Sequence, residues 1–194
     1  MRSPQTLSEA DRRLVAAWAA DCAERVLGLF EAEAPIDNRP RSAIARTRAF
    51  ARGELSTSEG IRSRFAGGVP VGEMRAPAVV AAARAAGQAV GVCHMGAHAL
   101  GAAAYAVKAA SLAAPDRPEI VAEEIGWQVA HMTADVRAAL RDLPPVGENL
   151  SGPLGPGLLA SGQLGAIIRD IQARLHEADP HVWAWAPPVS ATNQ

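Results

Sequence analysis

Two histidines and one tyrosine in the middle of the chain recur at helical spacing, where they could bind a ligand. His94 and His98 are four residues apart and Tyr105 follows seven residues later, so all three fall on one face of an α-helix. Glycines fill other positions of that face, and each would let another segment of backbone approach closely. The stripe comprises Arg84, Gly87, Gly91, His94, His98, Gly101, Tyr105 and Lys108. The other faces are apolar, which is typical of a helix buried in the middle of a protein, so we expect a site along this stripe.

The spacing of His94 and His98 is also that of two zinc ligands in enzymes with the HExxH motif. Here no glutamate lies between the two histidines, and a third ligand would have to come from Glu123, Glu124 or His131 further along the chain. Three interpretations stay open: a metal site with His94 and His98 as ligands, a pocket for a small molecule, and core histidines held by hydrogen bonds. We favour the last, and assign neither a metal ion nor a cofactor.

A second group of polar and aromatic residues shares one face of a later predicted helix. It consists of Glu124, Trp127, His131 and Asp135. His131 and Asp135 could form a general base whose tautomer the carboxylate fixes, although an ordinary charge pair at a solvated edge fits the same spacing. No serine or cysteine lies in a recognisable nucleophile motif, so we assign no catalytic residue and leave enzymatic activity open.

Helical periodicity accounts for nearly all of the chain, and no segment alternates polar and apolar residues long enough to predict a strand. Capping residues, prolines and glycines set the ends of each helix. The expected helices span about residues 8–33, 40–52, 58–65, 77–114, 119–143 and 161–177, with loops at 67–72 and 144–163. The sequence therefore predicts an all-α bundle of about six or seven helices around the Ala/Gly-rich segment 77–114.

The segment 77–114 is too long to be one straight helix. At 1.5 Å per residue it would extend roughly 57 Å, whereas a compact domain of this length is about 42 Å across. Gly87, Gly91 and Gly96 are the residues at which such a helix breaks most easily. We expect a break or a sharp kink between Ala86 and Gly96.

The turn at residues 115–118 should fold the next helix back beside this central segment. The glycine-bearing stripe would then meet the face of Trp127, and polar side chains from both helices would converge within the core. Buried polar groups need partners, so we expect these side chains to bond to one another or to a ligand. The candidate ligand-binding residues are His94, His98, Tyr105, Glu124, Trp127 and His131.

Composition narrows the class of protein. The 194 residues are 49% apolar but only 4% aromatic, which indicates small side chains on closely packed helices, and the net charge of −1 argues against a nucleic-acid partner. Residues 85–107 are uncharged and long enough to span a membrane, but they are mostly alanine and glycine. We therefore expect a buried helix and a protein recovered without detergent. Two cysteines and a start that does not look like a signal peptide indicate the cytoplasm.

We expect one all-helical domain over residues 1–178, followed by a tail, 179–194, that is rich in tryptophan and proline. Trp183 and Trp185 are unusual in an exposed end. They could dock on the domain's own surface or be buried in a second subunit of a homodimer.

Three segments resemble a family of bacterial putative immunity proteins, whose domain is similar to immunity protein five of polymorphic toxin systems. They are Trp18–Glu54 (WAADCAERVLGLFEAEAPIDNRPRSAIARTRAFARGE), Ala82–Ala110 (AARAAGQAVGVCHMGAHALGAAAYAVKAA) and the helix Trp127–Leu143. The resemblance covers most of residues 15–143. It implies an all-α cytosolic protein that binds and neutralises a toxin, a role assigned to the family from gene neighbourhood. It brings no catalytic motif.

Two classes of function follow. The first is an immunity-like binding protein, non-catalytic, with a protein partner. The second is a small-molecule-binding protein or an enzyme with a pocket of His, Tyr and Trp between the central helix and the next one. An acidic or aromatic surface patch would favour the first class, and a cavity lined by the candidate residues would favour the second.

Overall fold

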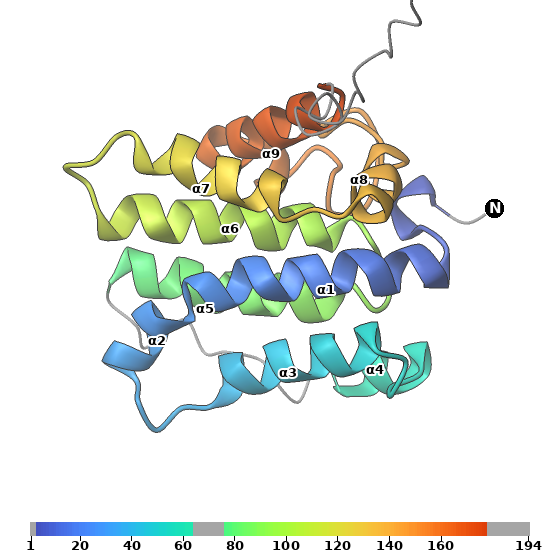
Figure 1. Cartoon of the computed structure of the whole chain (residues 1–194), viewed down its shortest axis with the longest axis horizontal. Helices are drawn as coiled ribbons and strands as arrows, with labels where there is room; N and C mark the ends of the chain where they lie inside the picture. The colour runs from blue at the N-terminus through green and yellow to red at the C-terminus, as the bar shows by residue number, and fades with distance from the viewer. Residues whose placement is uncertain (1–2, 64–75, 178–194) are drawn as a thin grey trace, which may run out of the picture.

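The computed structural model describes residues 3–63 and 76–177, and there every regular element is helical (Figure 1), so the all-α fold class is confirmed. The expected loop at 67–72 and the 179–194 tail lie outside the described residues. The α-helices are α1 (Glu9–Arg25), α2 (Leu27–Glu33), α3 (Arg39–Ala51), α4 (Thr57–Ser63), α5 (Pro77–Gly91), α6 (His98–Ala113), α7 (Ile120–Ala130), α8 (Ala134–Arg141) and α9 (Gly162–Leu175). Two 3-10 turns, η1 (Pro4–Thr6) and η3 (Leu158–Ala160), complete the described fold. Within residues 3–63 and 76–177 there are nine α-helices where we expected six or seven, because three predicted helices are each interrupted once.

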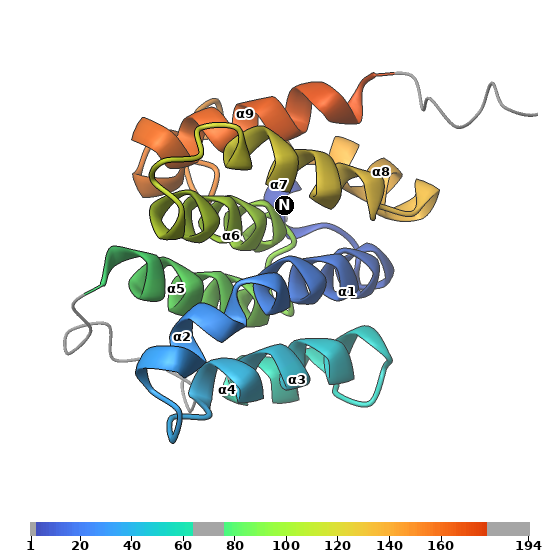
Figure 2. The same ribbon diagram turned by 60° about the vertical axis from the view of Figure 1, so that its left-hand side comes forward.

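The central segment breaks where its length requires. Helix α5 ends at Gly91 and α6 begins at His98, so the expected break between Ala86 and Gly96 is confirmed. The two halves fold back on each other as a hairpin (Figures 1 and 2). The N-terminal segment holds the turn, since Gly96 N donates to Thr6 O at 3.1 Å and Ala97 N to Gln5 O at 3.0 Å.

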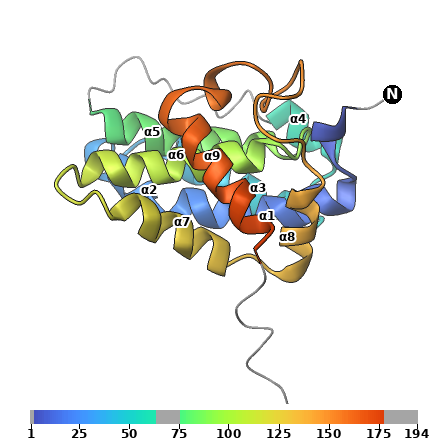
Figure 3. The ribbon, with the colours of Figure 1, turned by 90° about the horizontal axis from the view of Figure 1, so that it is seen from above.

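Helix α6 lies at the centre of the molecule. It contacts α1 and α5 on one side and α7 and α9 on the other, and α9 crosses above it (Figure 3). Its alanines have no exposed surface at positions 99, 102, 103, 104, 106 and 109. Such small side chains let neighbouring helices approach closely, which explains how so few aromatic residues can fill the core. No helix within 3–63 or 76–177 is long and apolar enough to cross a membrane.

The N-terminal segment is fastened to the C-terminal half of the chain through one buried amide. Gln5 is completely buried; its Nε2 donates to Ser151 O, and its Oε1 accepts from Leu154 N at 2.9 Å. Gly152 adopts φ +85°, and a Cβ at that position would come within 2.6 Å of Gln5 Oε1. Three segments therefore meet at Gln5: its own 3-10 turn, the α5–α6 turn and the 147–157 loop.

Two further interruptions divide the other long helices. Val26 separates α1 from α2, and residues 131–133 separate α7 from α8. Helix α7 starts at Ile120, one residue after the expected start of the helix 119–143, and no side chain caps it at Glu119. Thr133 begins α8, with its side chain accepting from Val136 N at 3.2 Å.

Thr133→Ala is expected to lower the free energy of unfolding by about 1 kcal/mol, because the substitution removes the acceptor that caps α8. Chemical denaturation monitored by circular dichroism measures the change. Thr133→Ser, which keeps the hydroxyl, is the control and should stay within about 0.5 kcal/mol of the original chain. Equal losses in both variants would show that the hydroxyl does not act as a cap.

Gly165→Ala is expected to destabilise the fold by about 1–3 kcal/mol. Gly165 lies in α9 against the η3 turn, and a Cβ there would collide with the backbone carbonyl of Ala160, which cannot rotate aside. Gly126→Ala in α7 is the matched control. A Cβ at Gly126 would have no neighbour within 4 Å, so this variant should gain up to about 1 kcal/mol of helix propensity. The prediction fails if both substitutions stabilise the protein.

Candidate functional site

The six residues predicted as a site fall into three groups, according to the contacts that the structure shows. His94 and His98 lie at the α5–α6 turn, with ring centroids 4.9 Å apart. Tyr105 is buried in α6, and Glu124, Trp127 and His131 cluster on α7 beside α1. The next helix does fold back beside α6 as expected, since Gln128 Nε2 donates to Ala103 O at 3.1 Å. A site shared by all six residues stays a prediction.

The glycine stripe packs within the hairpin instead of facing α7. A Cβ at Gly91 would lie 2.9 Å from the His98 ring, and a Cβ at Gly101 would collide with the Gln88 amide. Because the central helix breaks at residues 92–97, its second half folds onto its first, and the stripe makes room for its own side chains. This corrects the expectation that the stripe faces the Trp127 side of α7.

The space beside Gly91 and Gly101 is filled by two polar side chains that bond to each other. His98 Nδ1 and Gln88 Oε1 are 2.8 Å apart. An amide oxygen only accepts hydrogen bonds, so the proton of this bond resides on Nδ1. The pair borders a hollow of about 390 Å³ whose other walls come from residues 150–159, the loop rich in glycine and proline. Leu150 and Leu158 stand exposed at this hollow.

Tyr105 anchors the outer end of the hairpin. Its ring is 3% exposed, and its hydroxyl accepts from Arg84 NH1 at 3.1 Å. The Arg84 guanidinium carbon lies 5.7 Å from the ring centroid, which is within the range of a cation–π contact. Tyr105 thus has a partner from α5, the helix that carries the first part of the stripe.

The third group forms a stacked cluster at the surface. The Arg25 guanidinium carbon lies 3.9 Å from the centroid of the Trp127 ring, and the His131 ring stacks on Trp127 at 3.9 Å with an interplanar angle of 25°. His131 Nδ1 donates to the backbone oxygen of Trp127 at 2.8 Å, which fixes the imidazole against the indole. We call Arg25, Trp127 and His131 the Trp127 cluster.

Glu124 holds the Trp127 cluster in place from below. Its carboxylate is buried and accepts two parallel hydrogen bonds from Arg25, Nε to Oε1 and NH2 to Oε2, both at 2.8 Å. This geometry is the strong, bidentate form of the pair, and it raises the pKa of Arg25 above its ordinary value. A guanidinium held at both nitrogens keeps its plane fixed over the indole.

The backbone of α7 is fixed to α1 at the same place. Trp18 Nε1, in the core, donates to Gln128 O at 2.9 Å. The Trp127 cluster therefore sits on two helices that are tied together by a core hydrogen bond and a buried ion pair. Such a support keeps side chains in one arrangement before any partner arrives, which lowers the entropy lost on binding.

A recess of about 250 Å³ opens beside the cluster, lined by Asp21, Glu24, Arg25, Trp127 and His131. Arg48 of α3 forms ion pairs with both Asp21 and Glu24. The recess thus combines an aromatic wall with two partly exposed carboxylates. Cys22 lies under it fully buried, and burial raises the pKa of its thiol well above the ordinary value, with the Glu124 and Asp21 carboxylates raising it further. Cys22 is therefore no nucleophile in this recess.

Sequence patterns found three residues of this site, Glu124, Trp127 and His131, and missed the residues that α1 contributes. Asp21, Glu24 and Arg25 lie in the second half of α1, and no sequence signal set them apart from the other charged residues of that helix. The proposed pairing of His131 with Asp135 is wrong. The helix ends between them, so the imidazole bonds to the Trp127 carbonyl instead.

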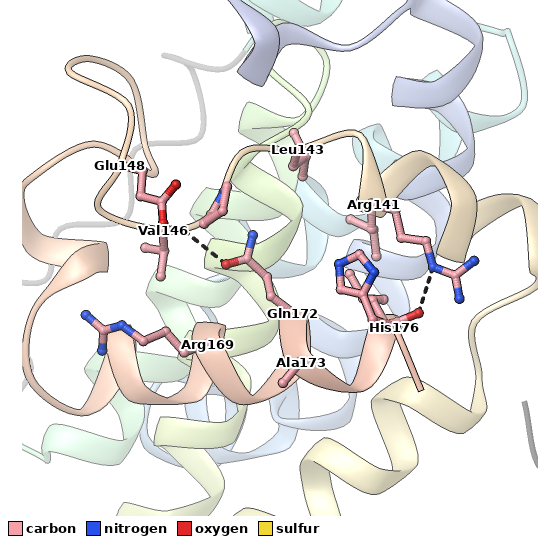
Figure 4. Close-up of a pocket in the computed structure, with 11 residues that line it drawn as sticks. Arg141, Leu143, Val146, Glu148, Arg169, Gln172, Ala173 and His176 are labelled. Atoms are coloured by element: carbon pink, nitrogen blue, oxygen red, sulfur yellow. Dashed lines mark hydrogen bonds between the residues drawn. The ribbon is translucent and has the colours of Figure 1, made fainter. Parts of the chain in front are cut away.

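A second hollow and the possible metal ligands complete the description of candidate sites. This hollow, of about 490 Å³, lies between α8, residues 143–148 and α9 (Figure 4). Within the residues described, no group of three or more His, Cys, Asp or Glu side chains is arranged to hold a metal ion.

The fold and the site define the class of this protein: an all-α protein whose candidate site is a preformed aromatic and charged cluster on the surface. Comparison with protein families then identifies the family of the chain. The Imm-5 like putative immunity protein family matches residues 5–135, and the chain belongs to this family. The match includes the whole Trp127 cluster and ends before the hollow at α8 and α9. Neither the curated proteins nor the solved structures include a match to the chain.

Proposed function

We propose that the chain is a cytoplasmic immunity protein that binds a protein toxin and blocks it without catalysis, using the surface around Trp127. The family supports an immunity-type role. The observation that carries the proposal is the Trp127 cluster itself. Tryptophan and arginine are the residues most enriched among those that dominate binding energy at protein interfaces.

The rigidity of the cluster also supports a role in recognition. Arg25 is fixed by Glu124, Trp127 lies between Arg25 and His131 in the stack, and His131 is fixed by the Trp127 carbonyl. A side chain already held in its bound position loses little freedom when a partner docks. Folding alone does not require an ion pair and a hydrogen bond to hold the side chains around a half-buried tryptophan. These contacts therefore fit a surface that binds another protein.

The recess indicates what the partner brings. An aromatic wall with two carboxylates at its edge suits a lysine or arginine side chain, whose methylene stem would lie along the edge of the stacked rings while its head joins Arg48 at Asp21 and Glu24. We therefore propose a toxin with a basic side chain at the centre of its contact surface.

The test is protection of growth in a bacterial host. The probe is the product of the gene adjacent to the one encoding this chain, expressed as the toxin. Co-expression of the original chain should restore growth, and co-expression of the Trp127→Ala variant should not. A chain that gives no protection against a toxic neighbour would contradict the proposal, and so would full protection by the variant.

A second candidate function rests on the hollow beside His98. Its walls combine the Gln88–His98 pair with two exposed leucines, a mixture of polar and apolar surface that suits a small molecule. Thermal-shift screening against a library of small metabolites tests it. A compound that stabilises the original chain but not the His98→Ala variant would favour this role over toxin binding.

A further inference from the structure

The hollow between α8 and α9 lies outside the part of the chain that the family matches. All the residues that line it fall between 140 and 176, whereas the match ends at residue 135. Its volume, about 490 Å³, is within the range of pockets that enclose a ligand. Membership of the family therefore says nothing about what binds in this hollow.

The framework of this hollow is held by hydrogen bonds on both sides (Figure 4). Gln172 Oε1 accepts from Val146 N at 3.0 Å and its Nε2 donates to Pro144 O at 3.0 Å, so one amide joins α9 to the opposite wall. At the other end, Arg141 Nε donates to Leu175 O at 2.7 Å. These bonds keep the two walls apart at a set distance, and the hollow is preformed.

Apolar side chains make the base of the hollow and cations its rim. Leu140, Leu143, Val146 and Leu175 contribute apolar surface at the base. Arg141, Arg169 and His176 stand exposed at the rim, against the single carboxylate of Glu148. An apolar base with guanidinium groups at the edge suits an indole, which packs by its area and attracts cations to its face.

Two tryptophans follow the rim residue His176 within ten positions of the sequence. Residue His176 lines the hollow, and the described part of the chain ends at residue 177. Trp183 follows seven residues after His176 and Trp185 two residues later. Seven extended residues reach up to about 24 Å, which is enough to bring Trp183 back over the hollow. Residues at i and i+2 point to the same side of an extended segment, so both indoles could face the base together.

We propose that residues 178–194 dock on their own domain, with Trp183 and Trp185 in the hollow between α8 and α9. A tethered segment that starts at the rim has an effective concentration in the millimolar range, so it occupies the hollow ahead of a free partner. Docking covers the apolar base and stacks Arg141 and Arg169 on the indoles. The tail thus binds to α8 and α9, which carry the hollow outside the segment that the family matches. This contact is separate from the Trp127 cluster, the proposed toxin-binding surface.

The full chain labelled with 5-fluorotryptophan tests this by fluorine NMR. Each of the four signals is assigned by replacing one tryptophan with phenylalanine, and a synthetic peptide of residues 178–194 gives the positions of the undocked indoles. We expect the Trp183 and Trp185 signals of the full chain to differ from those of the peptide. Light scattering should give the mass of a monomer, 20.2 kDa.

Ala173→Glu should displace the tail from the hollow, and Ala166→Glu is the matched control. Ala173 is exposed on α9 and lines the hollow, and Ala166 is exposed on the same helix but does not line it. Ala173→Glu should return both signals to the peptide positions, while Ala166→Glu should leave them unchanged. Peptide-like signals in the original chain would overturn the proposal. So would signals that survive Ala173→Glu, or a doubled mass, which would place the indoles in a second copy.

Discussion

Gln5→Ala is expected to lower the free energy of unfolding by about 2–4 kcal/mol. Removing the amide leaves the buried Leu154 N and the carbonyl oxygen of Ser151, whose bond to Gln5 is partly buried, without the partner that the side chain provides. Each buried group left without a partner costs about 1–3 kcal/mol. The loss is large for a residue so near the start of the chain because this one side chain joins the first turn to the 147–157 loop.

Urea denaturation followed by tryptophan fluorescence measures the loss, since Trp18 is in the core. Gln163→Ala is the control. Gln163 is an exposed glutamine that donates one bond to Ser111, and its replacement should cost no more than about 0.5 kcal/mol. Similar values for the two variants would mean that the Gln5 amide does not hold the loop.

Gly152→Ala probes the same contact from the opposite side. Position 152 has φ +85°, and an added Cβ would press on Gln5 Oε1. We expect a loss of at least about 1 kcal/mol from backbone strain, larger in the original chain than in the Gln5→Ala background, where the space is free. Additive losses in the double variant would contradict a direct contact.

Trp127→Ala is expected to weaken binding of the toxin by about 30-fold or more, which corresponds to about 2 kcal/mol. The indole is the part of the Trp127 cluster that both Arg25 and His131 contact. Without it, neither the guanidinium nor the imidazole keeps a stacked partner, and the aromatic wall of the recess is lost. His131→Ala should have a smaller effect, because His131 stacks at the exposed edge of the cluster.

Isothermal titration calorimetry with an inactivated variant of the same toxin measures this change. Arg117→Ala is the control, since Arg117 is an exposed cation on the turn before α7 and pairs with Glu119 and Glu123. It should change the affinity by less than about threefold. Thermal unfolding must show that Trp127→Ala remains folded. Unchanged affinity in a folded Trp127→Ala protein would remove the cluster from the interface.

Much of the fold could be predicted from local signals. Ser8 caps α1 by accepting from Asp11 N, at the position where the helix 8–33 was expected to begin. The break in the central segment followed from the length of the helix compared with the size of the domain. The breaks at Val26 and at residues 131–133 were missed because the apolar periodicity continues through both. After these breaks α2 packs on α5, and α8 packs on α1 and α9, contacts that a local pattern does not show.

The site could be predicted only in part, for a related reason. Helical phase placed Trp127 and His131 on one face correctly, but phase says nothing about which neighbouring helix that face meets. Once the central helix broke, His98 faced Gln88 within the hairpin, and the Trp127 cluster met α1. Arg25 lies inside the predicted helix 8–33 and was given no role there; its contact with Glu124, 99 residues away in sequence, gives it one.

Hydrogen exchange measured with and without the inactivated toxin tests the central claim most directly, because it locates the contact surface without any substitution. If the toxin binds through the Trp127 cluster, amides in the second half of α1 and in α7 should exchange more slowly in the complex. The α8–α9 hollow and the 150–159 loop should be unaffected. Protection confined to either of those regions, or absent from α1 and α7, would contradict the account.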